Sequence, residues 1–183
     1  MKKILICLVL ILQAGCAQTV PKKTENLCHI FEQNPSWFFV AEGVEERWRV
    51  QPHILIAMMY QESSFRQDAR PPEYLAFGIT PWGRVSSAYS YAQAQDAVWS
   101  EYLRDAAYKQ VERDDFEGAS DFMGYYINKT TSINDVAIDD VQMQYLCYHE
   151  GGAVVAKVLT EKSLGWSKWL ISCLNALKDT EFS

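Results

Sequence analysis

The sequence predicts one all-α domain, and three observations lead to this prediction. The chain has 183 residues, of which 49% are hydrophobic and 22% charged, a composition typical of a single globular domain. Apolar residues recur at intervals of three and four along most of the chain, as they do on the buried face of a helix. No stretch shows the sustained alternation of a half-buried strand, so no sheet is expected.

The first residues read as an export signal rather than as part of this domain. Lys2 and Lys3 precede the uncharged run 4–12. That run is too short to span a bilayer, but it has the length of the apolar region of a secretory signal. We therefore expect a signal peptide over residues 1–15.

Small residues before Cys16 resemble the lipobox of bacterial lipoproteins, although Gln13 stands where that motif usually has Leu. The resemblance implies acyl chains on Cys16, which give firm membrane attachment. Ala17, rather than Asp, implies the periplasmic face of the outer membrane. Residues 16–26 are then a lipidated tether, and 27–183 the folded domain. An ordinary signal peptide cleaved nearby is the alternative.

The helices of the domain are expected in the following order. Pro52 suits a first helical turn, Asp139 suits an N-cap, and Gly151 with Gly152 suits a helix end. One long irregular loop at 71–85 carries Trp82, and long loops in compact domains are often functional. The expected helical ranges are 40–49, 52–62, 89–108, 116–128, 139–149, 152–159 and 166–178.

Three cysteines remain once Cys7 and Cys16 are assigned to the signal and the lipid. An oxidising compartment favours one disulfide. We expect it between Cys28 and Cys173, which would close a loop of about 145 residues and stabilise the fold by roughly 4–5 kcal/mol. Cys147 lies in an apolar helical pattern and is expected to be a buried thiol.

The helix predicted at 52–62 ends in a carboxylate. Residues 54–60 are apolar on every side, which is typical of a helix buried in the middle of a protein. Glu62 shares a face with Leu55, Met58 and Met59. Apolar surroundings and the helix C-terminus both raise the pKa of a carboxyl group, as a general acid near neutral pH requires. The alternative is a solvated Glu62, or one paired with Arg66.

Three motifs carry a resemblance to a known family. Residues 62–69, with Glu62, Ser63, Phe65 and Ala69, resemble the Glu-Ser-x-Phe-x-x-x-Ala signature of the soluble lytic transglycosylases, which have the goose-type lysozyme fold. Residues 87–93 resemble Gly-Ala-x-Gly-Leu-Met-Gln, with the Ala and Gln kept. Residues 147–151 resemble Ala-Tyr-Asn-x-Gly, with the Tyr and Gly kept. A Trp-Gly-Arg loop before the second motif resembles a subgroup of small lipoproteins.

The resemblance implies a lysozyme-like domain that cleaves the bond from N-acetylmuramic acid to N-acetylglucosamine in peptidoglycan and leaves 1,6-anhydro ends. It implies that Glu62 acts as acid and base, without a metal or cofactor. Other side chains are expected to position this carboxyl group or bind sugar: Ser63, Gln93, Tyr148, Tyr91 and Trp82. Each has a structural alternative, namely a backbone-bonded hydroxyl for Ser63, a surface amide for Gln93 and core packing for the aromatic residues.

Other classes of function are less well supported. The net charge of −6 argues against a nucleic-acid partner, and the three histidines lack metal-ligand spacing. Two rivals stay open: a hydrolytic muramidase with a second carboxylate, and a non-catalytic wall-binding or scaffold lipoprotein of an envelope-spanning secretion machine. Three departures from the family pattern keep the second rival open, although the presence of Glu62 argues against it: Ser90 in place of Gly, His149 in place of Asn, and a longer insertion between the first two motifs.

Overall fold

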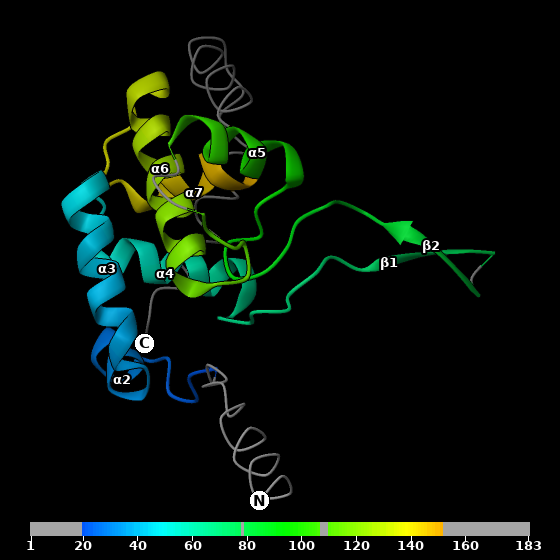
Figure 1. Cartoon of the computed structure of the whole chain (residues 1–183), viewed down its shortest axis with the longest axis horizontal. Helices are drawn as coiled ribbons and strands as arrows, with labels where there is room; N and C mark the ends of the chain where they lie inside the picture. Colours follow the sequence, from blue (N-terminus) through cyan, green and yellow to red (C-terminus); the bar gives the residue numbers. More distant parts are fainter. Residues whose placement is uncertain (1–19, 78, 107–109, 152–183) are drawn as a thin grey trace, which may run out of the picture.

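The computed structural model describes residues 20–77, 79–106 and 110–151, and these are mostly helical (Figure 1). None of the helices described is long and apolar enough to cross a membrane. The helices expected at 152–159 and 166–178, and the signal peptide, lie outside the described residues. The element order is α2 (Leu27–Gln33), α3 (Pro35–Trp48), α4 (Pro52–Ser63), β1 (Glu73–Ala76), β2 (Thr80–Arg84), α5 (Asp96–Asp105), α6 (Phe116–Asn134) and α7 (Val141–Glu150).

The helix starts follow local chemistry. Pro35 and Pro52 each occupy a first turn, where the missing N–H costs nothing. The side chains of Asp115 and Asp140 accept hydrogen bonds from backbone N–H groups three residues on and so cap α6 and α7. The cap of α7 is therefore Asp140, one residue beyond the expected Asp139.

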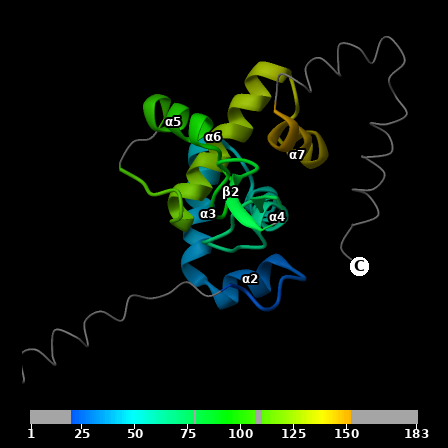
Figure 2. The same cartoon turned by 90° about the vertical axis from the view of Figure 1, so that its right-hand side faces the viewer.

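The core lies where α3, α4 and α6 contact one another (Figure 2). As expected from its apolar sequence, α4 is almost wholly buried along residues 54–59. The backbones of α3 and α6 approach closely at Gly124, where an added Cβ would lie 2.6 Å from Cδ1 of Trp48 and 2.7 Å from Cγ1 of Val44. Only glycine fits here without displacing the side chains of Trp48 and Val44.

A buried carboxylate of α6 ties this helix to two further helices. Asp121 of α6 accepts hydrogen bonds from Nη1 of Arg47 at 2.7 Å, Nε1 of Trp48 at 2.8 Å and the hydroxyl of Tyr102 at 2.6 Å. These donors come from α3 and α5. The carboxylate is thus compensated by one charge and two neutral donors, which is what a buried ion requires.

An aromatic cluster fixes the loops that carry the first two motifs. Trp37 of α3 stacks on Phe116 of α6 with ring centroids 3.9 Å apart and planes at 4°. Phe65, just after α4, lies 5.4 Å from Trp37, and Tyr91 lies 6.1 Å from it. The turns on either side of the candidate site are therefore anchored on one core cluster.

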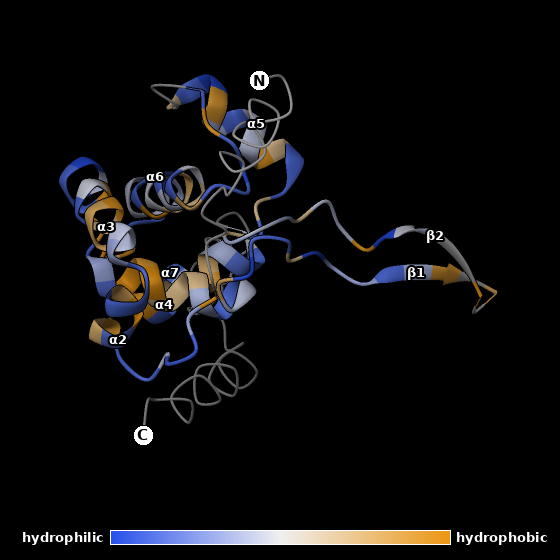
Figure 3. Cartoon of the chain, turned by 60° about the horizontal axis from the view of Figure 1, so that its bottom comes forward, coloured by the Kyte–Doolittle hydropathy of each residue, from blue (hydrophilic) through white to orange (hydrophobic). Residues whose placement is uncertain are grey.

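The expectation of an irregular loop at 71–85, with no strand, is wrong. β1 and β2 pair antiparallel in a hairpin that projects from the helices (Figures 1 and 3). An ion pair at its base joins Glu73 to Arg84 at 2.7 Å. The hairpin covers no core, so its large apolar side chains are exposed on both strands and show no alternation.

The helix expected at 89–108 is also shorter than its sequence pattern. Residues 89–95 form a tight turn closed by a bridge between Tyr89 and Ala94, and α5 begins only at Asp96. Ser90 and Gln93 have φ of +67° and +46°. A right-handed helix cannot continue through such left-handed residues.

Candidate active site

Glu62 lies in the last turn of α4, and the chain bends sharply after it. Ser64 and Phe65 follow with φ of +51° and +60°, conformations that are costly for residues with a side chain. Phe65 is buried against Trp37 and Tyr60, and this packing holds the bend. The helix therefore stops at a fixed place, with the Glu62 carboxyl group at its end.

The surroundings of Glu62 favour its neutral form. Burial raises the pKa of the Glu62 carboxyl from 4.5 to about 7, while the charge of nearby His149 acts less strongly in the opposite direction. Its Oε1 atom is buried and has no hydrogen-bond partner among the described residues. At this atom a carboxylate ion would have no hydrogen bond to offset the loss of its hydration, whereas burial of the neutral acid costs less free energy. Near neutral pH a large fraction of the molecules therefore carry this proton.

A cavity of about 300 Å³ opens beside this carboxyl group. Its walls come from the end of α4, from the turn before α5 and from one face of α7. The lining is mainly neutral and polar, which suits an uncharged ligand rich in hydroxyl and amide groups. Besides Glu62, the lining residues are Gln61, Ser86, Ala88, Gln93, Gln95, Tyr145, Tyr148 and His149.

A second cavity of about 180 Å³ adjoins the first and shares Gln93, Gln95, Tyr148 and His149 with it. Within the part of the chain that the structure describes, no carboxylate other than Glu62 lines the first cavity. Glu150 lines the second one, with Oε1 3.0 Å from Nδ1 of His149. The site therefore offers one acid at its centre and an extended polar surface beside it.

Gln93 joins the first two motifs to each other. Its Nε2 atom donates to the carbonyl oxygens of Ala69 at 3.0 Å and Ser90 at 2.7 Å, and the backbone N–H of Ser90 also donates to Ala69 at 2.8 Å. The side chain still lines the cavity of Glu62, and these bonds do not use its Oε1 atom. Gln93 thus shapes the site and keeps an acceptor for a ligand, so it is not a plain surface amide.

Two tyrosines of α7 face the carboxyl group. Tyr148 donates from its hydroxyl to the carbonyl of Ala92 and packs edge-on against Tyr126 at 5.0 Å. Burial, and then the charge of Glu62, raise the pKa of Tyr148 well above its usual value and that of Tyr145 to about 12. Both phenols therefore stay neutral beside Glu62.

Three expected ligand contacts lie elsewhere. Ser63 is buried and donates to the carbonyl of Met59 at 3.2 Å, so its hydroxyl serves the helix end. Tyr91 is only 1% exposed, and its place in the core cluster beside Trp37 excludes stacking on a sugar. Trp82 is 80% exposed on β2, away from the cavity of Glu62. The structure therefore assigns Ser63 and Tyr91 structural roles and leaves Trp82 as an exposed ring on the hairpin.

Two of the cysteines named in the predictions, Cys28 and Cys147, lie within the described residues. Cys147 is buried, as expected, and Cys28 is exposed on α2. Cys16 and Cys173 lie outside the described residues. Among the residues described, no group of three His, Cys, Asp or Glu side chains could hold a metal ion.

Several residues that line the cavity were not predicted from the sequence. Tyr145 and His149 lie on the same face of α7 as Tyr148, at intervals of three and four, and this spacing was the available signal. Gln95 and Ser86 come from loop segments, where no periodicity marks them.

Comparison with known proteins gives one match. The family model of the transglycosylase SLT domain matches residues 4–179, nearly the whole chain. Comparisons with curated proteins and with solved structures gave no match.

Proposed function

The chain belongs to the transglycosylase SLT-domain family, and from this premise we propose that it is a lytic transglycosylase of peptidoglycan. Its substrate is the glycosidic bond from N-acetylmuramic acid to N-acetylglucosamine. Its product carries a 1,6-anhydro end on the muramic sugar. The observation that carries the proposal is the half-buried Glu62, with a pKa of about 7, in a polar cavity.

The reaction needs one group that gives and then takes a proton. Protonated Glu62 donates its proton to the glycosidic oxygen as the bond from that oxygen to the anomeric carbon breaks. The resulting carboxylate takes the proton of the muramic C6 hydroxyl, whose oxygen bonds to the anomeric carbon. The proton count closes and no water is consumed. A pKa near the working pH suits both steps.

The walls of the cavity support binding of a neutral sugar. Oε1 of Gln93 and the hydroxyl of Tyr145 offer hydrogen-bond partners beside Glu62. The adjoining cavity has the partly buried Tyr126 in its wall, and aromatic side chains suit the apolar faces of sugar rings. A glycan strand lying across both cavities would place one linkage at Glu62.

Two variants separate this proposal from its rivals. Glu62→Gln should abolish lysis of isolated cell walls while leaving the fold intact. The matched variant Glu150→Gln alters the exposed carboxylate of the adjoining cavity and should keep activity. Loss of activity in both variants, together with reducing ends as the product of the wild-type protein, supports a two-carboxylate muramidase. An inactive wild-type protein that still binds walls supports the scaffold role in an envelope-spanning secretion machine.

The location belongs to the same proposal. A lipid anchor on Cys16 would hold the enzyme on the periplasmic face of the outer membrane, next to its substrate. Incorporation of labelled fatty acid into the wild type, and none into Cys16→Ser, would support the anchor. Release of the wild-type protein as a soluble species would oppose it.

A further inference from the structure

The three most exposed large apolar side chains among the described residues lie at the end of the hairpin of β1 and β2. Phe77 is fully exposed, and Ile79 and Trp82 are 83% and 80% exposed. Two residues of β1 are also more than half exposed. Large apolar side chains gathered in this way mark an interaction surface. We call these five side chains the hairpin tip: Tyr74, Leu75, Phe77, Ile79 and Trp82.

The hairpin tip carries no charge, and charged residues flank it on both sides. Residues 74–83 contain no Asp, Glu, Lys, Arg or His. Glu73 and Arg84 flank this run and pair with each other at 2.7 Å, and Arg84 also donates to the carbonyl of Pro71 at 2.7 Å. The hairpin is thus divided into an apolar end and a charged base.

Polarity falls along the hairpin from its base to its turn. Tyr74 pairs with Gly83 directly beyond the ion pair, and Trp82 precedes Gly83. Phe77 and Ile79 flank the turn. Tyr and Trp are enriched at the headgroup level of membranes, whereas Phe and Ile favour the hydrocarbon. The order of side chains is therefore that of a segment that enters a bilayer from its surface.

Both faces of the hairpin are bare, which indicates what could cover it. Neighbouring residues of a strand point to opposite faces, and the neighbours Tyr74 and Leu75 are both exposed. A flat protein surface would cover one face and leave the other in water, whereas a bilayer surrounds both. In the described chain the sheet has two strands, so its outer edges keep polar groups that need water. The hairpin could therefore enter the interfacial layer but not cross the bilayer.

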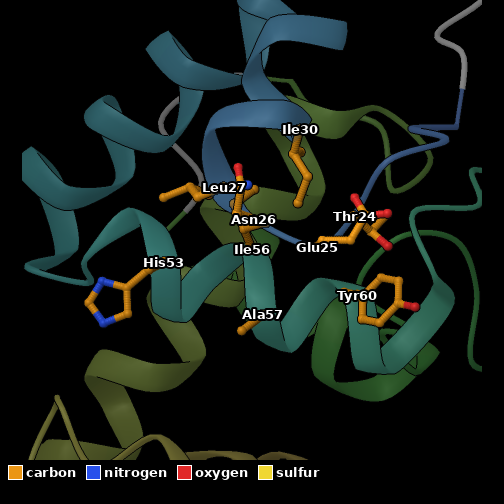
Figure 4. A pocket seen from close by; sticks show the side chains of 9 residues that line it. All are labelled: Thr24, Glu25, Asn26, Leu27, Ile30, His53, Ile56, Ala57 and Tyr60. Carbon is orange, nitrogen blue, oxygen red and sulfur yellow. The ribbon is translucent and has the colours of Figure 1, made fainter. Parts of the chain in front are cut away.

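A second apolar surface differs in shape and in charge. A cavity of about 300 Å³ with an almost wholly apolar wall lies between α2 and α4 (Figure 4). It is concave, and Glu25 and His53 are among the residues that line it. It therefore suits a small apolar molecule, whereas the projecting, uncharged hairpin tip suits a bilayer (Figures 1 and 3).

We propose that the hairpin tip docks the protein on a lipid bilayer, with its turn at the boundary of the acyl chains and its tyrosine and tryptophan among the headgroups. The inference rests on the proposed membrane location and not on lytic activity. The hairpin tip would add to the acyl chains on Cys16, because two membrane signals hold a protein more firmly than one.

Docking of the hairpin would also orient the candidate active site. Ser86, two residues after Arg84, lines the cavity of Glu62. The base of the hairpin is thus joined directly to a wall of this cavity, so a docked hairpin would hold the cavity beside the membrane surface.

The first test measures binding to vesicles by the mature chain with Cys16→Ser, which lacks an acyl anchor. The protein should co-sediment with vesicles of neutral phosphatidylcholine, and salt should weaken this binding little, because no charge is involved. Phe77→Ser combined with Ile79→Ser should weaken binding by about tenfold or more, since two large apolar side chains no longer enter the bilayer.

The matched control is Ile133→Ser, which removes an exposed apolar side chain from α6. It should bind vesicles as the parent does. Because all three substituted side chains are exposed, the fold should be retained in both variants. Equal vesicle binding by the double variant and the control, or no binding by the parent, would overturn the inference.

The second test locates the part of the chain that enters the bilayer. Vesicles with bromine near the headgroup end of the acyl chains quench the fluorescence of a tryptophan that lies among them. Trp82→Phe keeps an aromatic ring and should still bind, but most of the quenching should disappear. Undiminished quenching would show that another part of the chain enters the membrane and would overturn the inference.

Two other results would assign the hairpin tip a different partner and overturn the inference. One is a double variant that binds vesicles like its parent but co-sediments less with isolated cell walls, which indicates glycan binding. The other is a wild-type dimer that the double variant converts to a monomer without a change in vesicle binding. None of these measurements involves lysis, so their failure is separate from failure of the proposed enzyme.

Discussion

Removing the charge of Glu62 should make the protein more stable, but only at high pH. In the unfolded chain this carboxyl group releases its proton near 4.5, and in the folded protein it does so near 7. Between these pH values the folded state binds more protons, so stability falls as pH rises and levels off above about 7. At about 1.4 kcal/mol per pH unit, the gap corresponds to about 3 kcal/mol.

Urea unfolding of wild type and Glu62→Gln at several pH values measures this cost directly. Near pH 4 the two proteins should have nearly equal free energies of unfolding, and near pH 8 the variant should be more stable by about 3 kcal/mol. Glu150→Gln is the control for the same change from carboxyl to amide at an exposed position of the adjoining cavity. A difference between wild type and Glu62→Gln that is the same at both pH values would refute the claim that burial holds the proton on Glu62.

Three further substitutions test the fold and the hairpin. Asp121→Ala should lower the free energy of unfolding by about 3–5 kcal/mol, because three donors lose their acceptor, and Asp121→Asn should cost less in the same urea titration. Ser90→Gly should raise the free energy of unfolding by about 1 kcal/mol, and the melting temperature with it, because Ser90 has a left-handed backbone and its buried hydroxyl has no hydrogen-bond partner among the described residues. Ser90→Ala should raise the free energy of unfolding by less. Trp82→Ala should leave stability within about 0.5 kcal/mol, yet weaken co-sedimentation with cell walls if its exposed ring stacks on sugar; unchanged binding would exclude that role.

The sequence predicted a helix correctly where its apolar pattern agreed with a residue typical of a helix start. The uniformly apolar run of α4, opened by Pro52, predicted a buried helix that ends at Glu62, and the structure differs by one residue. The raised pKa of Glu62 followed from the same pattern. These features depend on local sequence and on burial, which periodicity reports.

The hairpin and the turn at 89–95 escaped prediction for physical reasons. The strands β1 and β2 bury neither face, so nothing imposes the alternation that marks a strand. In the turn, the apolar spacing continues that of a helix, while the left-handed φ of Ser90 is marked in the sequence only by a serine. A glycine there, as the family usually has, would have indicated the turn.

The sequence predicted the acid of the candidate site, Glu62, but it predicted less well which neighbouring residues line the cavity. Tyr91 and Tyr148 belong to similar aromatic patterns, but tertiary packing places one in the core and the other in the cavity wall. Ser63 follows the acid directly, yet the helical rotation turns its hydroxyl towards the carbonyl of Met59. Which neighbours of a catalytic residue reach the ligand is decided by packing between elements far apart in sequence.

The central claim is that one carboxyl group, on Glu62, both donates and accepts the proton, with no water in the reaction. Digestion of purified peptidoglycan in isotope-labelled water, followed by mass spectrometry of the muramic ends, tests this most directly. The account predicts anhydro ends that carry no label and that disappear with Glu62→Gln. Labelled reducing ends would contradict it and assign the reaction to hydrolysis.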